Sequence, residues 1–222
     1  MRAKAKRSVG YNKTNLEEDQ NLQKLKVNNE RDKIKKYVNS IGFNKVLDLG
    51  AGLGYWSFFF SDYCKHVTSV DFSSNMTSLA KNDAIKKQIT NIDFITSNIL
   101  EYQSKSIFDL VFMSGILIYI NDDDIKLLQK NIDNYTSAGS YLLLRDGTGK
   151  ANKHIINNKY SIELNSNYSA YYRTRDDYID IFHNIGFNLI KDENMFEIGS
   201  PLNKREETIL RIYLFKRNHG YK

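Results

Sequence analysis

The sequence predicts an α/β protein in which a doubly wound sheet carries helices on both faces. Short apolar segments alternate with segments whose apolar residues recur every three or four positions, which is the pattern of strands alternating with helices. A glycine-rich turn lies between the first such strand and the next helix, as it does in doubly wound sheets. The chain has 222 residues, of which 41% are hydrophobic, so it is long enough for one domain with its own core.

Several segments have the apolar spacing of helices. In the first, Ile34 and Val38 are four positions apart, and Gly42 suits its carboxyl end. Ser73 or Ser74 suits the amino-terminal cap of the third helix. Three aspartates begin the fourth helix, where their negative charge interacts favourably with the positive end of the helix dipole. The predicted helices cover about 16–41, 55–63, 73–87, 122–135 and 174–184.

Seven apolar segments predict strands. The fourth is nearly all apolar, as expected of a strand that is covered on both faces. A polar stretch runs from Gly147 to about Ser169, and we expect connecting chain there. The predicted strands cover 45–49, 66–70, 92–96, 108–113, 141–144, 187–191 and about 208–215.

The positive charge of the chain is concentrated in its N-terminal arm. Residues 1–45 hold 12 Lys and Arg against 5 Asp and Glu, whereas the rest of the chain holds 20 against 21. Three interpretations of this arm stay open: a solvated tail, a segment that attracts an anionic substrate, and a segment that contacts nucleic-acid phosphates.

The composition excludes several classes of protein. The single cysteine, Cys64, allows neither an intramolecular disulfide nor a cysteine-based zinc cage. No apolar run approaches the ~18 residues of a membrane span, and the basic start lacks the apolar stretch of a secretory signal. We therefore expect a cytoplasmic protein without a membrane partner.

In a doubly wound sheet the ligand binds beyond the carboxyl ends of the strands. The turn at 48–54 follows the first strand, and its glycines let a ligand approach the backbone closely. Its spacing fits neither the dinucleotide pattern G-x-G-x-x-G nor a P-loop. Asp48, at the root of the turn, suits a zwitterionic or cationic ligand. Asp71 ends the second strand and can accept both hydroxyls of a ribose, or else caps a helix.

The residues around this turn resemble a known family. VLDLGAGLG (46–54) and VTSVDFSSNM (67–76) resemble the first two motifs of the class I S-adenosylmethionine-dependent methyltransferases. FITSNILEY (94–102) and FDLVFMSGILIYI (108–120) resemble the third and fourth motifs more loosely. The resemblance covers roughly 30–216 and implies a seven-stranded, Rossmann-like sheet whose last strand is antiparallel to the others.

We expect the chain to have two parts. Residues 1–41 form an N-terminal basic arm and helix, a segment that in this family often folds over the cofactor as a lid. Residues 42–222 form the methyltransferase domain, in which an insertion at about 147–186 offers a lid for the substrate.

The resemblance implies S-adenosylmethionine as the cofactor and S-adenosylhomocysteine as the product. The glycine turn would lie under the methionine part, with Asp48 neutralising its ammonium and Asp71 holding the ribose. Asn98 stands where the family usually has Asp, and its amide oxygen can still accept from the adenine amino group. For Met113 the alternative to a cofactor contact is plain core packing. For the N-terminal arm with Tyr11, the alternative to a lid is a frayed terminus. The implied cofactor residues are Asp48, Gly50, Ala51, Gly52, Gly54, Asp71, Phe72, Met76, Asn98, Ile99, Met113, Ser114 and Tyr11.

The acceptor is inferred from what the fourth motif lacks. It has no (N/D)-P-P-(Y/F) signature of enzymes that methylate base amino groups, and Cys64 lies away from the strand ends, where a cytosine C5 enzyme needs its nucleophile. We therefore expect methyl transfer to a small, anionic molecule, with oxygen favoured as the acceptor atom, as in a sugar, a phosphate-bearing or a nucleotide-linked metabolite. We expect no nucleic-acid partner. N-methylation of a small molecule or peptide, and RNA methylation through the basic arm, stay open.

Residues near the fifth strand and in the insertion are candidates for chemistry and acceptor binding. The pKa of a histidine such as His154 lies near neutrality, which suits a general base, although a solvated loop histidine is the alternative. Asp146 could orient or deprotonate the acceptor, or pair with Arg145. Arg173 with a tyrosine hydroxyl could grip a phosphate or carboxylate, or else cap a surface. We expect no metal. The catalytic candidates are His154, Asp146 and Tyr172, and the substrate-binding candidates are Arg145, Tyr171 and Arg173.

Overall fold

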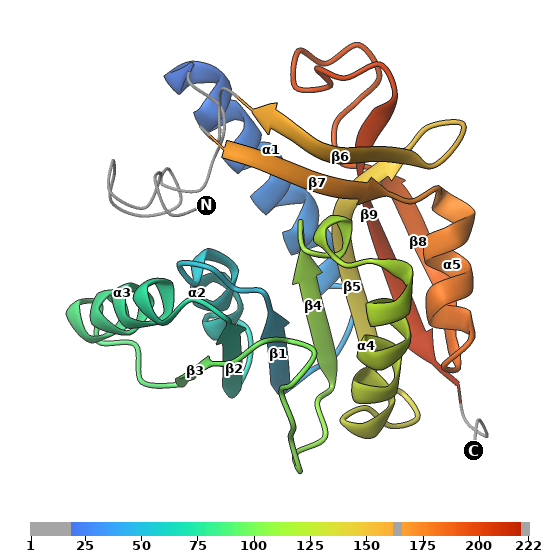
Figure 1. The fold of residues 1–222 in the computed structure, drawn as a ribbon. Coiled ribbons are helices and arrows are strands. Elements are labelled where there is room, and N and C mark those ends of the chain that lie inside the picture. The colour runs from blue at the N-terminus through green and yellow to red at the C-terminus, as the bar shows by residue number, and fades with distance from the viewer. Residues whose placement is uncertain (1–18, 162–165, 219–222) are drawn as a thin grey trace.

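The computed structural model describes residues 19–161 and 166–218 of the chain. Its main sheet contains β1 (Lys45–Leu49), β2 (His66–Asp71), β3 (Ile92–Thr96), β4 (Leu110–Ser114), β5 (Tyr141–Gly149), β8 (Phe187–Asn194) and β9 (Thr208–Arg217). The strand order is β3-β2-β1-β4-β5-β9-β8 (Figure 1). β9 runs antiparallel to both of its neighbours, and the other strands are parallel to one another. The predicted fold, including the antiparallel last strand, is confirmed.

Helices cover both faces of this sheet (Figure 1). They are α1 (Gln20–Val38), α2 (Tyr55–Ser61), α3 (Ser74–Lys86), α4 (Asp122–Asn134) and α5 (Arg175–His183). Alternate residues of β1 pack against the helices on opposite faces of the sheet, because successive side chains along a strand point to opposite faces. Leu47 and Leu49 pack into the core under α4 and α5, whereas Val46 packs into the core under α1 and α2. By the same alternation Asp48 lies on the α1–α2 side.

The helix starts are capped by side chains. Ser73 accepts a hydrogen bond from the Met76 amide, so its prediction as a cap is confirmed. Asn121 caps α4, whose first turn holds the three predicted aspartates. Thr174 and Asp177 form a reciprocal capping box at the start of α5. These caps fix where α3, α4 and α5 leave the strand ends.

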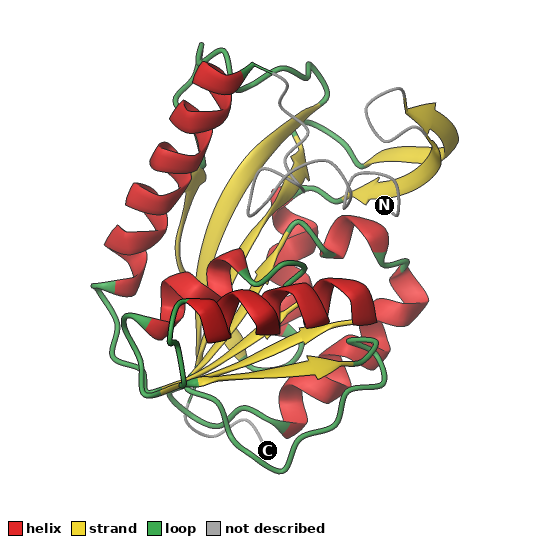
Figure 2. Cartoon of the chain, turned by 90° about the vertical axis from the view of Figure 1, so that its left-hand side faces the viewer, coloured by secondary structure: helices red, strands yellow, loops and turns green. Residues whose placement is uncertain are grey.

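The insertion differs from the expected connecting chain. β5 continues to Gly149, and β6 (His154–Ser161) pairs with β7 (Ser166–Tyr172) in a separate two-stranded sheet. Figure 2 shows this hairpin projecting beyond the edge of the main sheet. Most β6 side chains are exposed and polar, so the strand lacks the apolar alternation that would have predicted it. A short 3₁₀ turn, η3 (Leu117–Tyr119), also follows β4 and was not expected.

Helix α1 packs on the sheet through a single stripe of buried side chains. It has 19 residues, of which Glu30, Ile34, Tyr37 and Val38 are buried. Its remaining faces are polar and largely exposed, which is the pattern of a surface helix. The predicted start of this helix at Leu16 lies outside the described residues. Within 19–161 and 166–218, no helix combines the length and apolar character needed to cross a membrane.

Candidate active site

The glycine turn after β1 provides an open cradle at the carboxyl ends of the parallel strands. Gly50, Gly52 and Gly54 have φ of 76°, 58° and 75°, a left-handed conformation that glycine adopts without strain. A Cβ on Gly50 would come within 2.9 Å of the Ile116 side chain, so the turn is packed there. Among the described residues, a Cβ on Gly52 would meet nothing closer than the Met76 sulfur at 3.9 Å. The backbone at Gly52 is therefore open to a ligand.

Asp71, at the end of β2, is bound to this turn. One carboxylate oxygen accepts from the Gly52 amide at 2.8 Å, and the other accepts from the Ser73 amide at 2.9 Å. A carboxylate offers about four acceptor positions, so each oxygen keeps capacity for a further donor. Two vicinal hydroxyls are donors of the kind that this arrangement can receive.

Asp48 is buried beneath the turn. Its carboxylate accepts from the Ser57 hydroxyl at 2.6 Å, and Ser57 in turn lies 3.0 Å from the Ser69 hydroxyl. Burial raises the pKa of Asp48 to about 7, and the negative charge of Asp71 adds to this rise. A ligand ammonium nearby would favour the ionised form and lower that pKa. The glycine cradle, Asp71 and Asp48 together fit the methionine, ribose and ammonium groups of S-adenosylmethionine.

The other predicted cofactor residues are spread around this centre. The Ala51 amide donates to Val70 in β2, which fixes the turn. Phe72 is 63% exposed beside Asp71, and Met76 lies against Gly52. Asn98 already accepts from the Leu100 amide at 3.1 Å. Ile99 and Met113 belong to the buried core, and the Ser114 hydroxyl accepts from Arg145. Tyr11 lies outside the described residues.

On the acceptor side, Arg145 connects β5 to α1. It forms an ion pair with Glu30, which is fully buried, and its other guanidinium nitrogen donates to the Ser114 hydroxyl at 3.1 Å. Asp146 accepts from the Leu117 and Gly147 amides, both at 2.8 Å. Burial raises the pKa of Asp146 to about 6. Asp146 therefore anchors the start of η3, while Arg145 holds α1 over the strand ends.

Arg173 is committed to the segment that follows β4. It is 2% exposed and donates to the carbonyl oxygens of Leu117 and Ile120 and to the carboxylate of Asp122. These contacts hold the segment 117–122 in place. In this position Arg173 acts as a structural bracket, and its guanidinium binds the protein's own backbone and Asp122.

The hairpin residues gather near the end of β5. The Tyr172 hydroxyl accepts from Arg205 at 2.9 Å, and its ring packs on Gly147, where an added Cβ would come within 2.7 Å. His154 lies opposite Tyr172 across the hairpin, with ring centroids 5.9 Å apart. Tyr171 lies opposite Ile155 on the same hairpin. The structure thus brings the three catalytic candidates together, with Asp146 buried and close enough to Tyr172 to act on it electrostatically.

Four residues near the site were not predicted: Glu30, Ser57, Tyr119 and Arg205. One of them carried a sequence signal, since Glu30 lies four positions before Ile34 on the buried stripe of α1. Burial raises the pKa of Tyr119 to about 12, with Tyr172, Asp146, Tyr168 and Arg205 close enough to act on it electrostatically. Tyr119 and Arg205 come from segments far apart in the sequence, so spacing could not pair them. Among the described residues no cluster of His, Cys, Asp and Glu could hold a metal ion.

Comparison with known proteins finds a methyltransferase domain within the chain. Residues 46–139 match a family model described as a methyltransferase domain. Phosphoethanolamine N-methyltransferase 3 of Arabidopsis thaliana is 28% identical over 121 residues, which is 53% of this chain and 24% of the relative. The chain thus spans about a quarter of that relative's length. The rRNA adenine N-6-methyltransferase of Limosilactobacillus reuteri is 24% identical over 69% of this chain and 59% of its own.

A solved structure extends the comparison to the fold. The glycopeptide N-methyltransferase MtfA, complexed with S-adenosyl-L-homocysteine, superposes with a TM-score of 0.67 at 13% identity, covering 85% of this chain and 89% of that one. At such identity the likeness concerns the fold. The matched model shows a methyltransferase domain at 46–139, and the likeness of fold agrees with a class I methyltransferase that uses S-adenosylmethionine as its cofactor.

Proposed function

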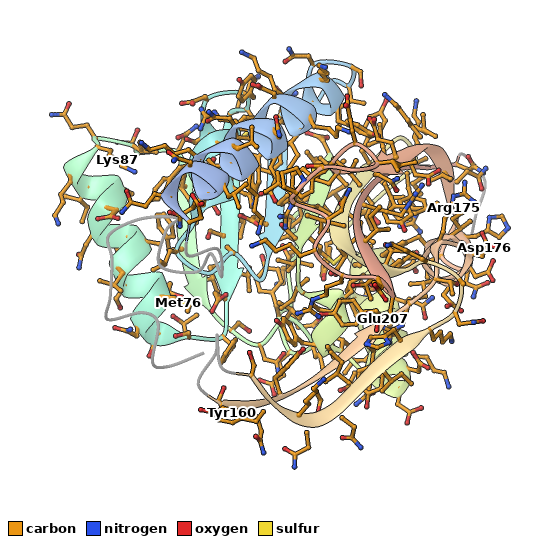
Figure 3. The ribbon with its side chains drawn as sticks, turned by 90° about the horizontal axis from the view of Figure 1, so that it is seen from above. Met76, Lys87, Tyr160, Arg175, Asp176 and Glu207 are labelled. Carbon is orange, nitrogen blue, oxygen red and sulfur yellow. The ribbon has the colours of Figure 1, made fainter. Side chains whose placement is uncertain are left out.

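We propose that this protein transfers the methyl group of S-adenosylmethionine to a small molecule that bears an anionic group, with oxygen as the favoured acceptor atom. The observation that carries the proposal is the single unit formed by the open glycine turn and Asp71. It lies at the carboxyl edge of the sheet, where doubly wound folds bind their ligands. Figure 3 looks onto this edge, with Met76 marking the side on which the turn lies.

The cofactor supplies an activated methyl group on a sulfonium. The chain supplies position: Asp71 accepts the ribose hydroxyls, and ionised Asp48 faces the ammonium. Ser57 holds the Asp48 carboxylate in place through its 2.6 Å hydrogen bond. Holding the reacting atoms ~3–3.5 Å apart can contribute ~7–11 kcal/mol to catalysis. Alignment of the acceptor atom with the methyl group therefore contributes more to the rate of methyl transfer than any single catalytic side chain does.

The proposed acceptor site lies beyond the ends of β4 and β5, under the insertion at about 147–186. Tyr119, Tyr168 and Tyr172 approach one another there, and Arg205 lies at hydrogen-bond distance from the Tyr172 hydroxyl. Arg205 is exposed, and a guanidinium suits a carboxylate or phosphate. With a pKa of about 12, Tyr119 keeps its proton at neutral pH and can donate a hydrogen bond to the acceptor. We assign the anionic group of the acceptor to Arg205.

Nitrogen is the second candidate for the acceptor atom. The names of two proteins similar to this chain specify N-methylation, of phosphoethanolamine and of a glycopeptide. The first of these names combines an amine with a phosphate, which agrees with an anionic group held by Arg205. We further propose that the protein acts in the cytoplasm on a free metabolite, with residues 1–41 as a lid over the cofactor.

Two measurements test this function. Radiolabelled S-adenosylmethionine is incubated with the protein and panels of small acids, phosphate esters, amines and RNA, and label in each class is counted. We expect label in a small anionic acceptor, with a several-fold higher KM in Arg205→Gln. Methylation confined to RNA, with the steep salt dependence of phosphate contacts, would contradict the proposal.

A further inference from the structure

A cavity adjoins the proposed acceptor site, on the side away from the glycine turn. The end of β5, the start of β9, the first residue of α5 and the segment 198–203 line it. Its volume is about 610 Å³, and small-molecule sites usually measure ~300–1,000 Å³. The cavity is therefore large enough for a metabolite.

This cavity is too far from the glycine turn to hold the methyl-accepting atom. β4 and β5 lie between β1 and β9, which makes three strand spacings of ~4.8 Å, or about 14 Å. In Figure 3, Met76 beside the glycine turn and Arg175 beside the cavity lie at opposite sides of the molecule. A methyl acceptor must come within ~3–3.5 Å of the methyl group. A ligand that lies wholly within the cavity is thus separate from the methyl acceptor.

The wall of the cavity is positively charged. Lys150, Arg175 and Arg211 line it, and none of the described residues that line it is acidic. Asp192 lies behind the wall and pairs with both arginines. Asp176, which is exposed, also pairs with Arg175.

The lining of the cavity thus holds three cations and, among the described residues, no acid. The Lys150 ammonium donates to the backbone carbonyl of Arg205 at 3.0 Å. In the described part of the chain, the buried Nε of Arg211 has no hydrogen-bond partner. An anion in the cavity would meet the Lys150 ammonium and the guanidinium groups of Arg175 and Arg211.

The cavity also offers apolar surface. Ile209 lines it from β9, and Ile198 lines it from the connecting segment while remaining 91% exposed. A large exposed aliphatic side chain beside cations favours a ligand with both an apolar and an anionic part. We propose that this cavity binds a small organic anion, a carboxylate or a phosphate monoester with an apolar part, as a ligand distinct from cofactor and acceptor.

The test is a calorimetric titration of the full chain, saturated with S-adenosylhomocysteine, with phenyl phosphate, benzoate and inorganic phosphate. We expect one of the two aromatic anions to bind more tightly than inorganic phosphate, and the preferred one identifies the acid group. Lys150→Gln should weaken binding about tenfold, which corresponds to about 1.4 kcal/mol. Ser200→Glu places a carboxylate in the wall and should abolish binding. Lys86→Gln, an equal loss of charge on α3, should have no effect.

Two comparisons decide the result. Arg205→Gln alters the proposed acceptor site but keeps the backbone carbonyl that Lys150 uses, so binding in the cavity should persist in it. Anion binding that Lys150→Gln and Ser200→Glu leave intact, or no anion binding at all, overturns the inference. Binding of S-adenosylhomocysteine is measured on the same samples. If S-adenosylhomocysteine does not bind, that result contradicts the proposed function and not the anion site. The anion titration is then carried out on the ligand-free chain.

Discussion

The carboxylate of Asp71 accepts a 2.8 Å hydrogen bond from the backbone amide of Gly52. This bond joins the end of β2 to the tip of the turn that follows β1. The sequence predicted an acid for the ribose and, separately, a glycine cradle for the methionine. This hydrogen bond makes them one unit. A change at either residue should disturb both parts of cofactor binding.

Replacing Asp71 by Ala should weaken the binding of S-adenosylhomocysteine by about a hundred-fold or more. Hydrogen bonds to a charged group contribute about 1.5–3 kcal/mol each, and the ribose would lose two. Titration calorimetry measures the effect. Asp93→Asn is the matched control, because Asp93 is an acid on the adjacent strand β3 whose partner is His66. Equal affinities for the two variants would contradict the assignment of Asp71.

Replacing Gly52 by Ala should abolish cofactor binding while costing only modest stability. The left-handed conformation at φ 58° costs a residue with a Cβ about 1–2 kcal/mol. Gly139→Ala provides the control, since Gly139 has φ 89° and lies at the other end of β5, with no atom of the described residues within 4 Å of an added Cβ. Both variants should lose similar free energy of unfolding in a denaturant titration. Only Gly52→Ala should lose affinity for S-adenosylhomocysteine, and a loss shared by both would contradict the cradle.

Cofactor affinity should rise with pH between about 6 and 7.5. Burial holds the pKa of Asp48 at about 7 in the ligand-free protein, so the carboxyl is largely protonated at pH 6. The ligand ammonium favours the ionised form, and binding therefore releases a proton below pH 7. Affinity should increase several-fold over this interval and then level off. Asp48→Asn, whose amide oxygen can still accept from Ser57, should show a flat profile. Parallel profiles in the two proteins would exclude Asp48 as the group that titrates.

Glu30→Ala should destabilise the fold by about 3–5 kcal/mol. It leaves the Arg145 charge buried without its carboxylate, and breaking a buried ion pair is costly in this way. The double variant Glu30→Leu with Arg145→Met should recover most of that loss, because two apolar side chains replace the pair. Urea unfolding curves of the three proteins measure both effects. A single variant as stable as the parent would show that the pair does not hold α1 in place.

Arg173→Ala should lower stability by several kcal/mol, since its guanidinium joins two backbone carbonyls to Asp122. Arg173→Lys should rescue little of this, because an ammonium cannot span the three acceptors. Thermal unfolding compares the variants. A stable Arg173→Ala with a raised acceptor KM would instead restore the anion-binding role predicted from the sequence.

The parts of the fold that follow from the sequence are those with strong local patterns. Leu47 and Leu49 lie in an apolar run beside a glycine turn, and the strand was predicted with the bounds that the structure shows. The β6–β7 hairpin was missed because residues such as Asn157 and Lys159 are exposed and polar, and Ile156 is the one buried residue of β6, so the strand shows no apolar alternation. Its pairing depends on β7 rather than on its own composition.

The site divides in the same way. Asp71 and Gly52 could be found from motif spacing, because both lie at or just after the end of a predicted strand. The contact of Arg145 with Glu30 joins residues 115 positions apart, which no local pattern specifies. Arg173 beside two tyrosines suggested an anion site, but its neighbours in space are the carbonyls after β4. Sequence gives the residue type, and only the fold determines whether a buried guanidinium meets a ligand or the backbone.

A crystal structure of the chain with S-adenosylhomocysteine tests the central claim most directly. The account predicts ribose hydroxyls within hydrogen-bond distance of both Asp71 oxygens and the amino-acid part of the ligand over Gly52. A ligand seated elsewhere, with the turn and Asp71 untouched, would contradict it.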